Sequence, residues 1–349
     1  MTLDVSVIVV NHRTAPEAAR CVESLRHEFQ TERIAGEVVL VDCDSGDPEQ
    51  AKLHAIKPDV FVPLSENRGY SGGCNAGLAR ARASRVIFSN ADVVYARGCL
   101  PALLRALDDG SVGAVAPLAF WDAGAKIRMP PGYAPGFWRD LMQLSAGRWP
   151  ALDRRRFAAF ARETLRLWEK GGDTKHLTGA VLAVRRDVLD RAGRFDESFP
   201  FEFEETEWED RARSLGFRLR FLPEARVQHL YARSAGRSAE AGERRATGAR
   251  LYRRRRYGRW WTAVLEKAPA LSRPVAASVL ARPFVPALSG GAVAISPNPS
   301  LLPFAGASLA QDFEMPAEVI DSLTSGPIYL RSFRTVDGQP IETFVWRKS

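Results

Sequence analysis

Apolar runs rich in β-branched residues recur along the first part of the chain, separated by segments with helical periodicity. Each run has the length of a strand that is buried on both faces, as in a parallel sheet. The runs lie at residues 4–11, 37–43, 59–64, 85–94 and 112–120. Strands that alternate with helices predict βαβ units, and therefore a mostly parallel sheet with helices on both faces.

The segments between the runs carry the helix signals. After the first run, Thr14 and Glu17 are spaced as a capping box. The apolar stripe of the helix that follows consists of Ala18, Val22, Leu25 and Phe29. A glycine-rich turn opens a second helix within residues 67–83, and residues 99–109 form a third amphipathic helix.

Periodicity weakens in the middle of the chain and returns later. Residues 121–175 are predicted to form a flexible loop that contains one helix, at 154–170. A strand and a helix are expected within residues 179–193, and two short strands within residues 217–230.

The C-terminal part is rich in Pro, Gly and Ser and then turns β-like. Asp337 and Gly338 separate two strand-like runs, which predicts a hairpin. We expect a main domain over residues 1–265, divided into a nucleotide-binding half (1–120) and an acceptor-binding half (121–265). A linker (266–284) and a β-rich accessory domain (285–349) complete the prediction.

Composition supports an ordinary globular protein. Of 349 residues, 46% are hydrophobic and 26% are charged, which excludes the disordered and fibrous classes. No apolar run reaches the roughly 18 residues of a membrane span, and the N-terminus lacks the basic start of a signal peptide. The four cysteines show no paired or metal-type spacing, which suits a reducing compartment. These features predict a cytoplasmic protein.

Several polar residues follow the predicted strands, where ligands of open α/β sheets gather. Asp92 follows the fourth strand and can hold Mg²⁺ or Mn²⁺, although capping of the next turn by Asn90 or Asp92 is an equal alternative. Asp42 follows the second strand and can accept hydrogen bonds from a ribose or a base. The glycines after Arg68 can admit a phosphate, although a simple tight turn is the commoner explanation.

The most acidic stretch of this basic chain is residues 200–217. A helix that starts near Glu204 would bury a stripe of Trp208, Ala212 and Leu215. Ion pairs at i,i+4 are expected between Glu207 and Arg211 and between Glu209 and Arg213. Helix pairing does not require Glu204 and Glu205 side by side next to Phe201 and Phe203. Two adjacent acids near apolar rings should have at least one raised pKa, as a general base needs near neutral pH.

In order, the segments VSVIVVNHR, VDCDSGD, NRGYSGGCNAGL, VIFSNADVV, LTGAVLAVRRDVL, FEFEETEWEDR and PEARVQHL resemble the inverting family 2 glycosyltransferases, and above all their rhamnosyltransferase-like branch. The resemblance covers about residues 4–260. It implies a GT-A fold and transfer of a sugar from a nucleoside-diphosphate sugar (a UDP- or dTDP-sugar, including dTDP-rhamnose) to an acceptor hydroxyl, in polysaccharide or glycoconjugate synthesis.

The resemblance also implies roles by position. The EETEW segment supplies the catalytic base, Glu205, with Glu204 as its rival. NAD replaces the family's D-x-D motif, so Asp92 and His229 would bind Mn²⁺ or Mg²⁺. Acceptor contacts fall on Gly179, Glu207 and Trp208. Donor contacts fall on Val10, Asn11, Arg13, Asp42, Asn67, Arg68, Gly69, Gly73, Asn75, Asn90, Ala91 and Asp92.

Two other functions remain open at this point: a nucleotidyltransferase, and a basic protein that binds nucleic acid or a membrane surface on a transferase-like fold. The second is suggested by the arginine-rich residues 233–261. The complete transferase pattern before this run argues against a nucleic-acid partner, so we expect none. We predict instead peripheral contact with the inner face of the membrane through residues 244–261. A glycan, lipid-linked or small-molecule acceptor and a homodimer are further expectations.

Overall fold

A computed structural model describes residues 2–133, 135–145, 147–230, 239–323 and 325–348. The chain forms two compact units. Unit 1 consists of Met1–Ala119 and Gly171–Tyr252, and unit 2 of Phe120–Lys170 and Arg253–Ser349. Each unit is therefore built from two separate stretches of sequence. The predicted domains, with boundaries at 120, 265 and 285, are each continuous in the sequence, whereas each of these units combines two ranges.

The sheet of unit 1 confirms the expected α/β class. Its strands follow the order β3-β2-β1-β4-β8-β6-β9-β5, and β7 pairs with β9. The first four in this order are parallel, and β8 joins them antiparallel to β4. The strands are β1 (Val5–Asn11), β2 (Gly36–Cys43), β3 (Val60–Leu64), β4 (Arg85–Asn90), β5 (Val93–Tyr95), β6 (Val112–Phe120), β7 (Gly172–Thr174), β8 (Val181–Arg185) and β9 (Arg218–His229).

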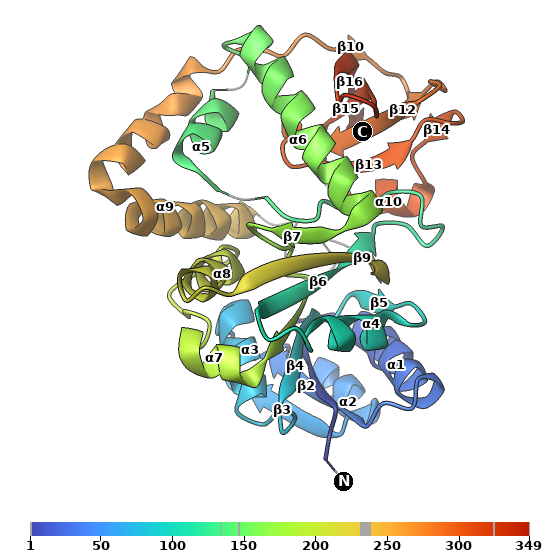
Figure 1. Ribbon diagram of the computed structural model, residues 1–349, viewed down its shortest axis with the longest axis vertical. Coiled ribbons are helices and arrows are strands. Elements are labelled where there is room, and N and C mark those ends of the chain that lie inside the picture. Colours follow the sequence, from blue (N-terminus) through green and yellow to red (C-terminus); the bar gives the residue numbers. More distant parts are fainter. Residues whose placement is uncertain (1, 134, 146, 231–238, 324, 349) are drawn as a thin grey trace. The chain divides into compact units, whose positions relative to one another are not determined.

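Helices cover both faces of this sheet (Figure 1). On one side lie α1 (Ala15–Thr31), α2 (Asp47–Ala55) and α4 (Cys99–Ala106). On the other lie α3 (Gly69–Leu78), α7 (Arg186–Ala192) and α8 (Glu204–Ser214). The central strands β1 and β2 are almost entirely buried as a result, which explains their continuous apolar sequence.

Two glycines let α3 pack directly on the sheet. A Cβ at Gly77 would lie 2.3 Å from Cγ2 of Ile8, and one at Gly73 would lie 2.6 Å from Cγ1 of Val10. Gly73 and Gly77 are four residues apart, so they share one helix face. Gly73, which is also a predicted donor contact, has a packing role here: its missing side chain makes room for β1.

Three local predictions for unit 1 are wrong. Thr14 precedes α1, but its hydroxyl donates to Oδ1 of Asn11 at 2.8 Å instead of capping the helix. The two strands expected in 217–230 form one continuous strand, β9. Its Pro223 lies between the residues that pair with β7 and those that pair with β5, so the missing N–H disrupts neither pairing. Leu215 follows α8 and is 43% exposed, whereas Trp208 and Ala212 are buried as expected.

Unit 2 combines the middle of the chain with its C-terminal part. Residues 121–175, expected to be a flexible loop with one helix, contain two helices, α5 (Phe137–Leu144) and α6 (Pro150–Lys170). The C-terminal elements are α9 (Ala239–Lys267, shared with unit 1), a 3₁₀ turn (Ala268–Leu271), β10 (Ser278–Val279), β11 (Phe284–Val285), β12 (Gly291–Ser296), β13 (Ala305–Ser308), β14 (Phe313–Glu314), α10 (Ala317–Ser322), β15 (Gly326–Arg334) and β16 (Pro340–Lys348).

A five-stranded sheet of order β10-β16-β15-β12-β13 forms the β-rich part of unit 2. The predicted hairpin is confirmed: β15 and β16 pair antiparallel, and Gly338 in the turn has φ of 70°. The core includes Trp121 and Ile127 from the middle segment together with residues of 285–346. The indole of Trp121 donates to Oγ of Ser322 at 3.0 Å. The C-terminal strands thus share one core with a segment about 200 residues earlier.

None of the described helices is long and apolar enough to cross a membrane. All four cysteines are described, and each is a buried free thiol.

Candidate active site

The carboxyl ends of β1 and β2 carry a bonded pair of polar side chains. Asn11 and Asp42 are register partners, and Nδ2 of Asn11 donates to Oδ1 of Asp42 at 3.1 Å. Ser45 donates to the same carboxylate through its hydroxyl and, at 3.1 Å, through its backbone N–H. The carboxylate is fully buried, so in this structure Asp42 holds the loop after β2. Ser45, which the sequence reasoning missed, is central to that loop.

Other predicted donor residues surround these strand ends. Arg13 has a left-handed backbone (φ 58°), and its N–H donates to Oγ of Ser45 at 2.8 Å. Nδ2 of Asn67 lies 3.4 Å from Nε2 of His12. Val10, near the end of β1, packs against Gly73 of α3. The structure therefore brings the residues after β1, β2 and β3 together, and it adds His12 to the set.

Arg68 and Asn75 both contact the segment after α7. The guanidinium of Arg68 pairs with Glu197, and Nδ2 of Asn75 donates to Oε1 of Glu197 at 2.8 Å and to the carbonyl of Phe195 at 2.9 Å. Gly69, with φ of 68°, supplies the left-handed turn between Arg68 and α3. These residues fasten the 195–197 segment to the start of α3. Glu197 gave no signal in the sequence because its partners lie more than 100 residues away.

The predicted metal ligands do meet. Nε2 of His229 lies 3.2 Å from Oδ1 of Asp92 and 3.4 Å from Nδ2 of Asn90. Strand β5 pairs Val93 with His229, which brings the end of β9 next to the turn after β4. Ala91 and Asp92 are each 4% exposed, and His229 is 7% exposed.

This set fits a divalent cation that keeps open positions. Among the described residues, no three His, Cys, Asp or Glu side chains converge on one point, so an ion here would rely on Asp92, His229 and the amide of Asn90. One carboxylate, one imidazole and one amide oxygen suit Mn²⁺ or Mg²⁺, with positions left for phosphate oxygens and water.

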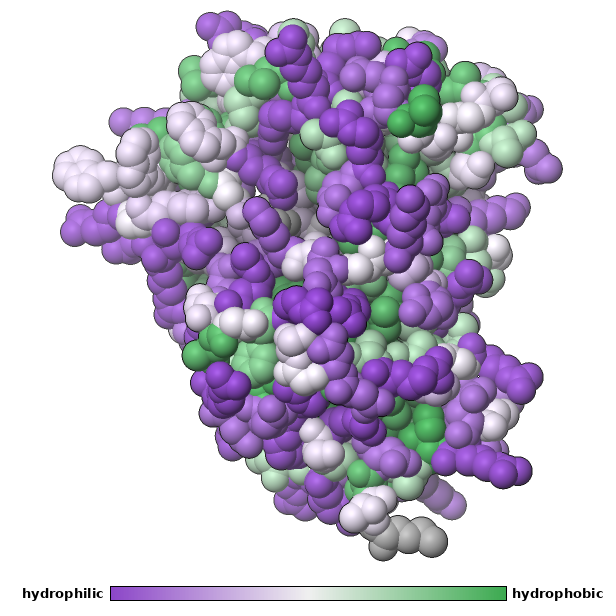
Figure 2. Space-filling view, viewed as in Figure 1, coloured by the Kyte–Doolittle hydropathy of each residue, from purple (hydrophilic) through white to green (hydrophobic). Residues whose placement is uncertain are grey.

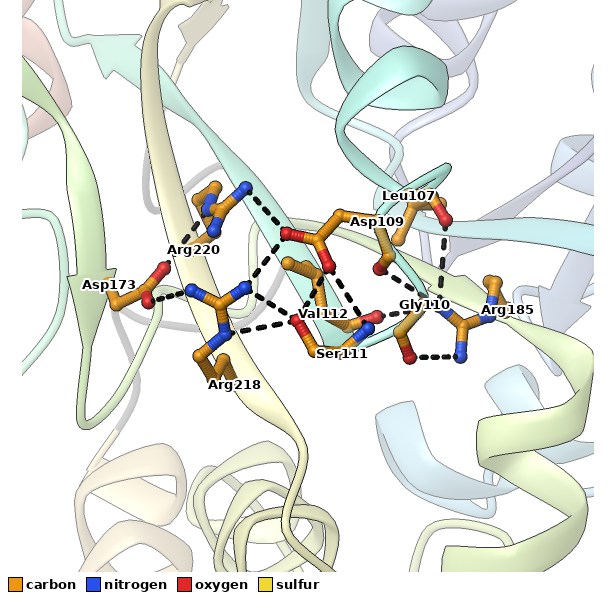
Figure 3. Close-up of polar contacts among 9 residues, drawn as sticks. All are labelled: Leu107, Asp109, Gly110, Ser111, Val112, Asp173, Arg185, Arg218 and Arg220. Atoms are coloured by element: carbon orange, nitrogen blue, oxygen red, sulfur yellow. Dashed lines mark hydrogen bonds and ion pairs between the residues drawn. The ribbon is translucent and has the colours of Figure 1, made fainter.

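The strand that carries His229 is anchored by an ion network at its other end (Figure 3). Arg218 donates to Asp109 at 2.8 Å and to Asp173 at 2.7 Å, and Arg220 donates to Asp173 at 3.0 Å. These bonds join β9 to β7 and to the turn before β6. Arg185 binds the carbonyls of the same turn, at Gly110 and Val112 among others. The network fixes the course of β9.

The acid pair lies at the start of α8, as predicted. Glu204 is 4% exposed, and Oε2 of each glutamate is buried without a hydrogen-bond partner. A Cβ at Gly179 would lie 2.7 Å from Oε1 of Glu205, so the carboxylate rests directly on the glycine. Burial raises the pKa of Glu205 to about 8. Burial, and next the charge of Glu205, raises the pKa of Glu204 well above its usual range.

Residues of α3 form the other side of the acid pair. The hydroxyl of Tyr70 donates to the carbonyl of Gly179 at 3.2 Å. Burial, followed by the nearby Cys74, Glu205 and Glu204, raises the pKa of Tyr70 well above its usual range. Tyr70 was not predicted, although its place two residues after Arg68 puts it in the glycine-rich turn. The two glutamates therefore lie in an apolar enclosure with one neutral phenol.

The remaining acids of α8 bond to groups of the protein itself. Glu207 pairs with Arg211, as predicted, at 2.9 Å. Glu209 does not pair with Arg213. Its side chain is fully buried. One carboxylate oxygen accepts a hydrogen bond from the N–H of Leu177 at 3.1 Å, and the other lies 2.8 Å from Nδ1 of His176. Arg213 pairs with Asp210 instead.

Trp208, a predicted acceptor contact, is buried in this structure. Its side chain has no exposed surface, and its indole N–H donates to the carbonyl of Gly193 at 2.8 Å. Trp208 belongs to the core beneath α8, where its partner is the end of α7.

Comparisons with known proteins agree with this architecture. An N-acetylglucosaminyl-diphospho-decaprenol L-rhamnosyltransferase from Mycobacterium tuberculosis is 28% identical over 282 residues, covering 76% of this chain and 89% of the relative. A mannosyltransferase from Pyrobaculum calidifontis, solved with GDP-Man and Mn²⁺, shares the fold with a TM-score of 0.51 and 19% identity. That match covers 78% of this chain and 70% of the other.

The expected GT-A fold is thus confirmed, with a β-rich C-terminal region added to it. The sequence itself matches the family described as "Glycosyl transferase family 2" over residues 6–191, more than half of the chain. The protein belongs to glycosyl transferase family 2 and is a glycosyltransferase enzyme.

Proposed function

We propose that the protein is an inverting transferase that moves a sugar from a nucleoside-diphosphate sugar to an acceptor hydroxyl, with Glu205 as the general base. The observation that carries this proposal is the buried acid pair against Gly179, in which Oε2 of Glu205 has no hydrogen-bond partner. A carboxylate with a pKa of about 8 is a stronger base than an ordinary glutamate, and its ionised form increases as pH rises from 6 to 8.

Glu205 fits the role better than Glu204 does. Glu205 as a whole residue is partly exposed, whereas Glu204 is 4% exposed, although Oε2 of each carboxylate is buried. Because two adjacent carboxylates in an apolar site cannot both ionise readily, Glu204 holds a proton while Glu205 reacts. The charge of Glu205 is itself one of the causes that keep Glu204 protonated.

With Glu205 as the base, the proposed reaction is a single displacement at the anomeric carbon. Glu205 takes the proton of the acceptor hydroxyl while that oxygen forms a bond to the anomeric carbon. The bond between the anomeric carbon and the diphosphate oxygen breaks with its electron pair, and the nucleoside diphosphate leaves. One displacement inverts the anomeric centre. General-base help of this kind contributes roughly 10²–10⁴-fold to the rate.

The donor would bind at the carboxyl ends of β1, β2 and β4. His12, Asn67 and Arg68 supply polar groups for the nucleotide, and Arg68 would exchange Glu197 for a phosphate. Asn90, Asp92 and His229 would hold Mn²⁺ or Mg²⁺. The ion, when bound, would neutralise charge on the diphosphate leaving group.

The proposed donor is a dTDP- or UDP-sugar, with dTDP-rhamnose first. This rests on the M. tuberculosis relative, which is a rhamnosyltransferase by name. That relative's acceptor sugar is carried on a lipid diphosphate, and we propose a glycan or lipid-linked hydroxyl here, in surface polysaccharide synthesis at the inner face of the membrane.

Calorimetric titration of dTDP, UDP and GDP, each with and without Mn²⁺, tests donor binding. We expect metal-dependent binding of dTDP or UDP that Asp92→Ala abolishes and Glu205→Gln preserves. The Glu205→Gln variant should lose transfer by at least about 100-fold, while Glu224→Gln, which removes an exposed acid from β9, should not.

Two outcomes would contradict the proposal. Transfer by Glu205→Gln at the wild-type rate would remove Glu205 from the role of base. Release of pyrophosphate rather than a nucleoside diphosphate would favour the nucleotidyltransferase alternative.

A further inference from the structure

Unit 2 exposes large aromatic side chains that most soluble domains bury. Trp138 on α5 is 73% exposed, and on α9 Trp260 is 88% and Trp261 is 57% exposed. Figure 2 shows pale side chains of intermediate hydropathy that project over α9, among purple hydrophilic ones. Clustered exposed apolar surface of this kind marks an interaction site.

Two of these tryptophans, Trp138 and Trp261, belong to a ring cluster. Phe137 lies at its centre, with ring centroids 5.3 Å from Trp138, 4.9 Å from Trp261 and 6.0 Å from Tyr257. Such edge-to-face contacts restrict the rings before any partner binds. The cluster joins α5 to α9 although the two helices are about 120 residues apart in the sequence.

The same part of α9 is strongly basic. Arg254, Arg255, Arg256 and Arg259 are all exposed. The helix breaks at Gly258, where φ is 80° and ψ is 173°, between the three consecutive arginines and the tryptophan pair. After the break, Thr262 and Leu265 face the interior, whereas Val264 is 44% exposed on the side of the tryptophans.

We propose that this Trp–Arg surface, made of Trp138, Trp260, Trp261, Arg254, Arg255, Arg256 and Arg259, docks the enzyme on an anionic lipid bilayer. Indole rings prefer the depth of lipid headgroups, and arginines beside them attract anionic lipids. Part of the basic run, residues 233–238, lies outside the described residues, so the proposal rests on the residues of unit 2 alone.

Exposed aliphatic side chains favour a bilayer over nucleic acid as the partner of this surface. A nucleic-acid site also combines arginine with aromatic rings, but Val264 and Leu271, each more than 40% exposed, have no role in stacking on bases. Aliphatic side chains next to tryptophan instead suit the boundary of the acyl chains. The inference does not depend on which sugar is transferred, although it would bring the enzyme to a lipid-linked acceptor.

Flotation of the full-length protein with vesicles tests the proposal. Vesicles of phosphatidylcholine alone are compared with vesicles containing one third phosphatidylglycerol, at 0.15 M salt. We expect binding to the anionic vesicles only. Trp260→Ala combined with Trp261→Ala should weaken it at least tenfold, and so should replacement of Arg254, Arg255 and Arg256 by Gln.

Matched controls separate docking from general charge and folding. Replacement of Arg20, Arg80 and Arg97 by Gln removes the same charge from exposed positions of unit 1 and should leave vesicle binding unchanged. Val336→Ala removes an 84% exposed aliphatic side chain and should also have no effect. Circular dichroism checks that each variant is folded.

Three results would overturn the proposal: no binding of the folded wild-type protein to anionic vesicles, equal loss in the unit 1 charge variant, or tighter binding to duplex DNA than to vesicles at the same salt. Donor binding and transfer to a soluble acceptor, measured on the same variants, distinguish a failure of docking from a failure of the proposed function.

Discussion

Unit 1 contains buried carboxylates in two contrasting settings. Glu37, on β2, is 1% exposed and accepts hydrogen bonds from Ser6 at 2.6 Å and from the backbone and side chain of Arg82 at 2.8 and 2.7 Å. Glu205, at the start of α8, has one buried oxygen without any partner. Burial would raise both pKa values, but the hydrogen bonds from Ser6 and Arg82 lower that of Glu37, whereas that of Glu205 rises to about 8.

This difference separates carboxylates that hold the fold from one that can do chemistry. A carboxylate with all its hydrogen bonds made is stabilised as an anion and is a weak base. A carboxylate in an apolar enclosure gains stability when it takes up a proton. The contrast can be tested by measuring stability and the rate of transfer. The largest change in stability is expected at Glu37, where a substitution removes the acceptor of several hydrogen bonds.

Replacement of Glu37 by Ala should destabilise unit 1 by about 3 kcal/mol. The change leaves Oγ of Ser6 and the N–H of Arg82 without their acceptor, and removal of one partner from a buried charged group is costly. Urea unfolding measures the effect. Glu32→Ala, in a more exposed ion pair with Arg97, is the control and should cost less than about 1 kcal/mol.

The Glu205→Gln variant should become more stable than the wild type as pH rises. The folded pKa of about 8 lies above the usual 4.5, so the stability contributed by the protonated carboxyl is complete below pH 4.5 and is lost as pH rises through 8. The Gln side chain stays neutral at every pH, so the variant does not lose this stability. Thermal unfolding from pH 6 to 8 should show a difference that grows by roughly 2 kcal/mol.

Glu37→Gln should show the opposite trend. Its pKa is lowered, so its contribution is present above the usual pKa and is lost on acidification. Parallel pH trends for the two variants would contradict the contrast between the two sites.

The rate of transfer should rise with pH. If Glu205 must lose its proton before it can act, kcat/KM for the acceptor follows the ionisation of Glu205 in the donor-bound enzyme and increases by roughly 50-fold between pH 6 and 8. A profile of kcat/KM against pH measures this, with the donor saturating. A flat profile over that range would show that the reacting base has an ordinary pKa.

Gly179→Ala should slow transfer by about tenfold with little loss of stability. The new methyl would lie 2.7 Å from Oε1 of Glu205, and the flexible carboxylate can move away, which displaces the base but spares the core. Gly110→Ala, at an open surface position, is the control for substitution of glycine. Unchanged activity in Gly179→Ala would mean that the position of the carboxylate on this glycine is unimportant.

The acids of α8 illustrate where sequence reasoning succeeds and where it stops. The pairing of Glu207 with Arg211 was predictable because both lie on one helix, four residues apart. The burial of Glu209 against His176 was not, since its partner lies 33 residues away on a different segment. The resemblance implied an acceptor contact for Trp208, but the side chain points into the core beneath α8 and has no exposed surface.

The apolar and turn patterns by themselves determined the parallel strands of unit 1 and the C-terminal hairpin, because these depend on neighbours in the sequence, and the order of the motifs carried the resemblance to the family. Only the tertiary structure decided that residues 120–170 share a core with the C-terminal strands, that Gly73 makes room for β1, and that Glu209 is buried against His176. The physical reason is that burial and side-chain partners depend on segments far apart in the chain, which no local pattern records.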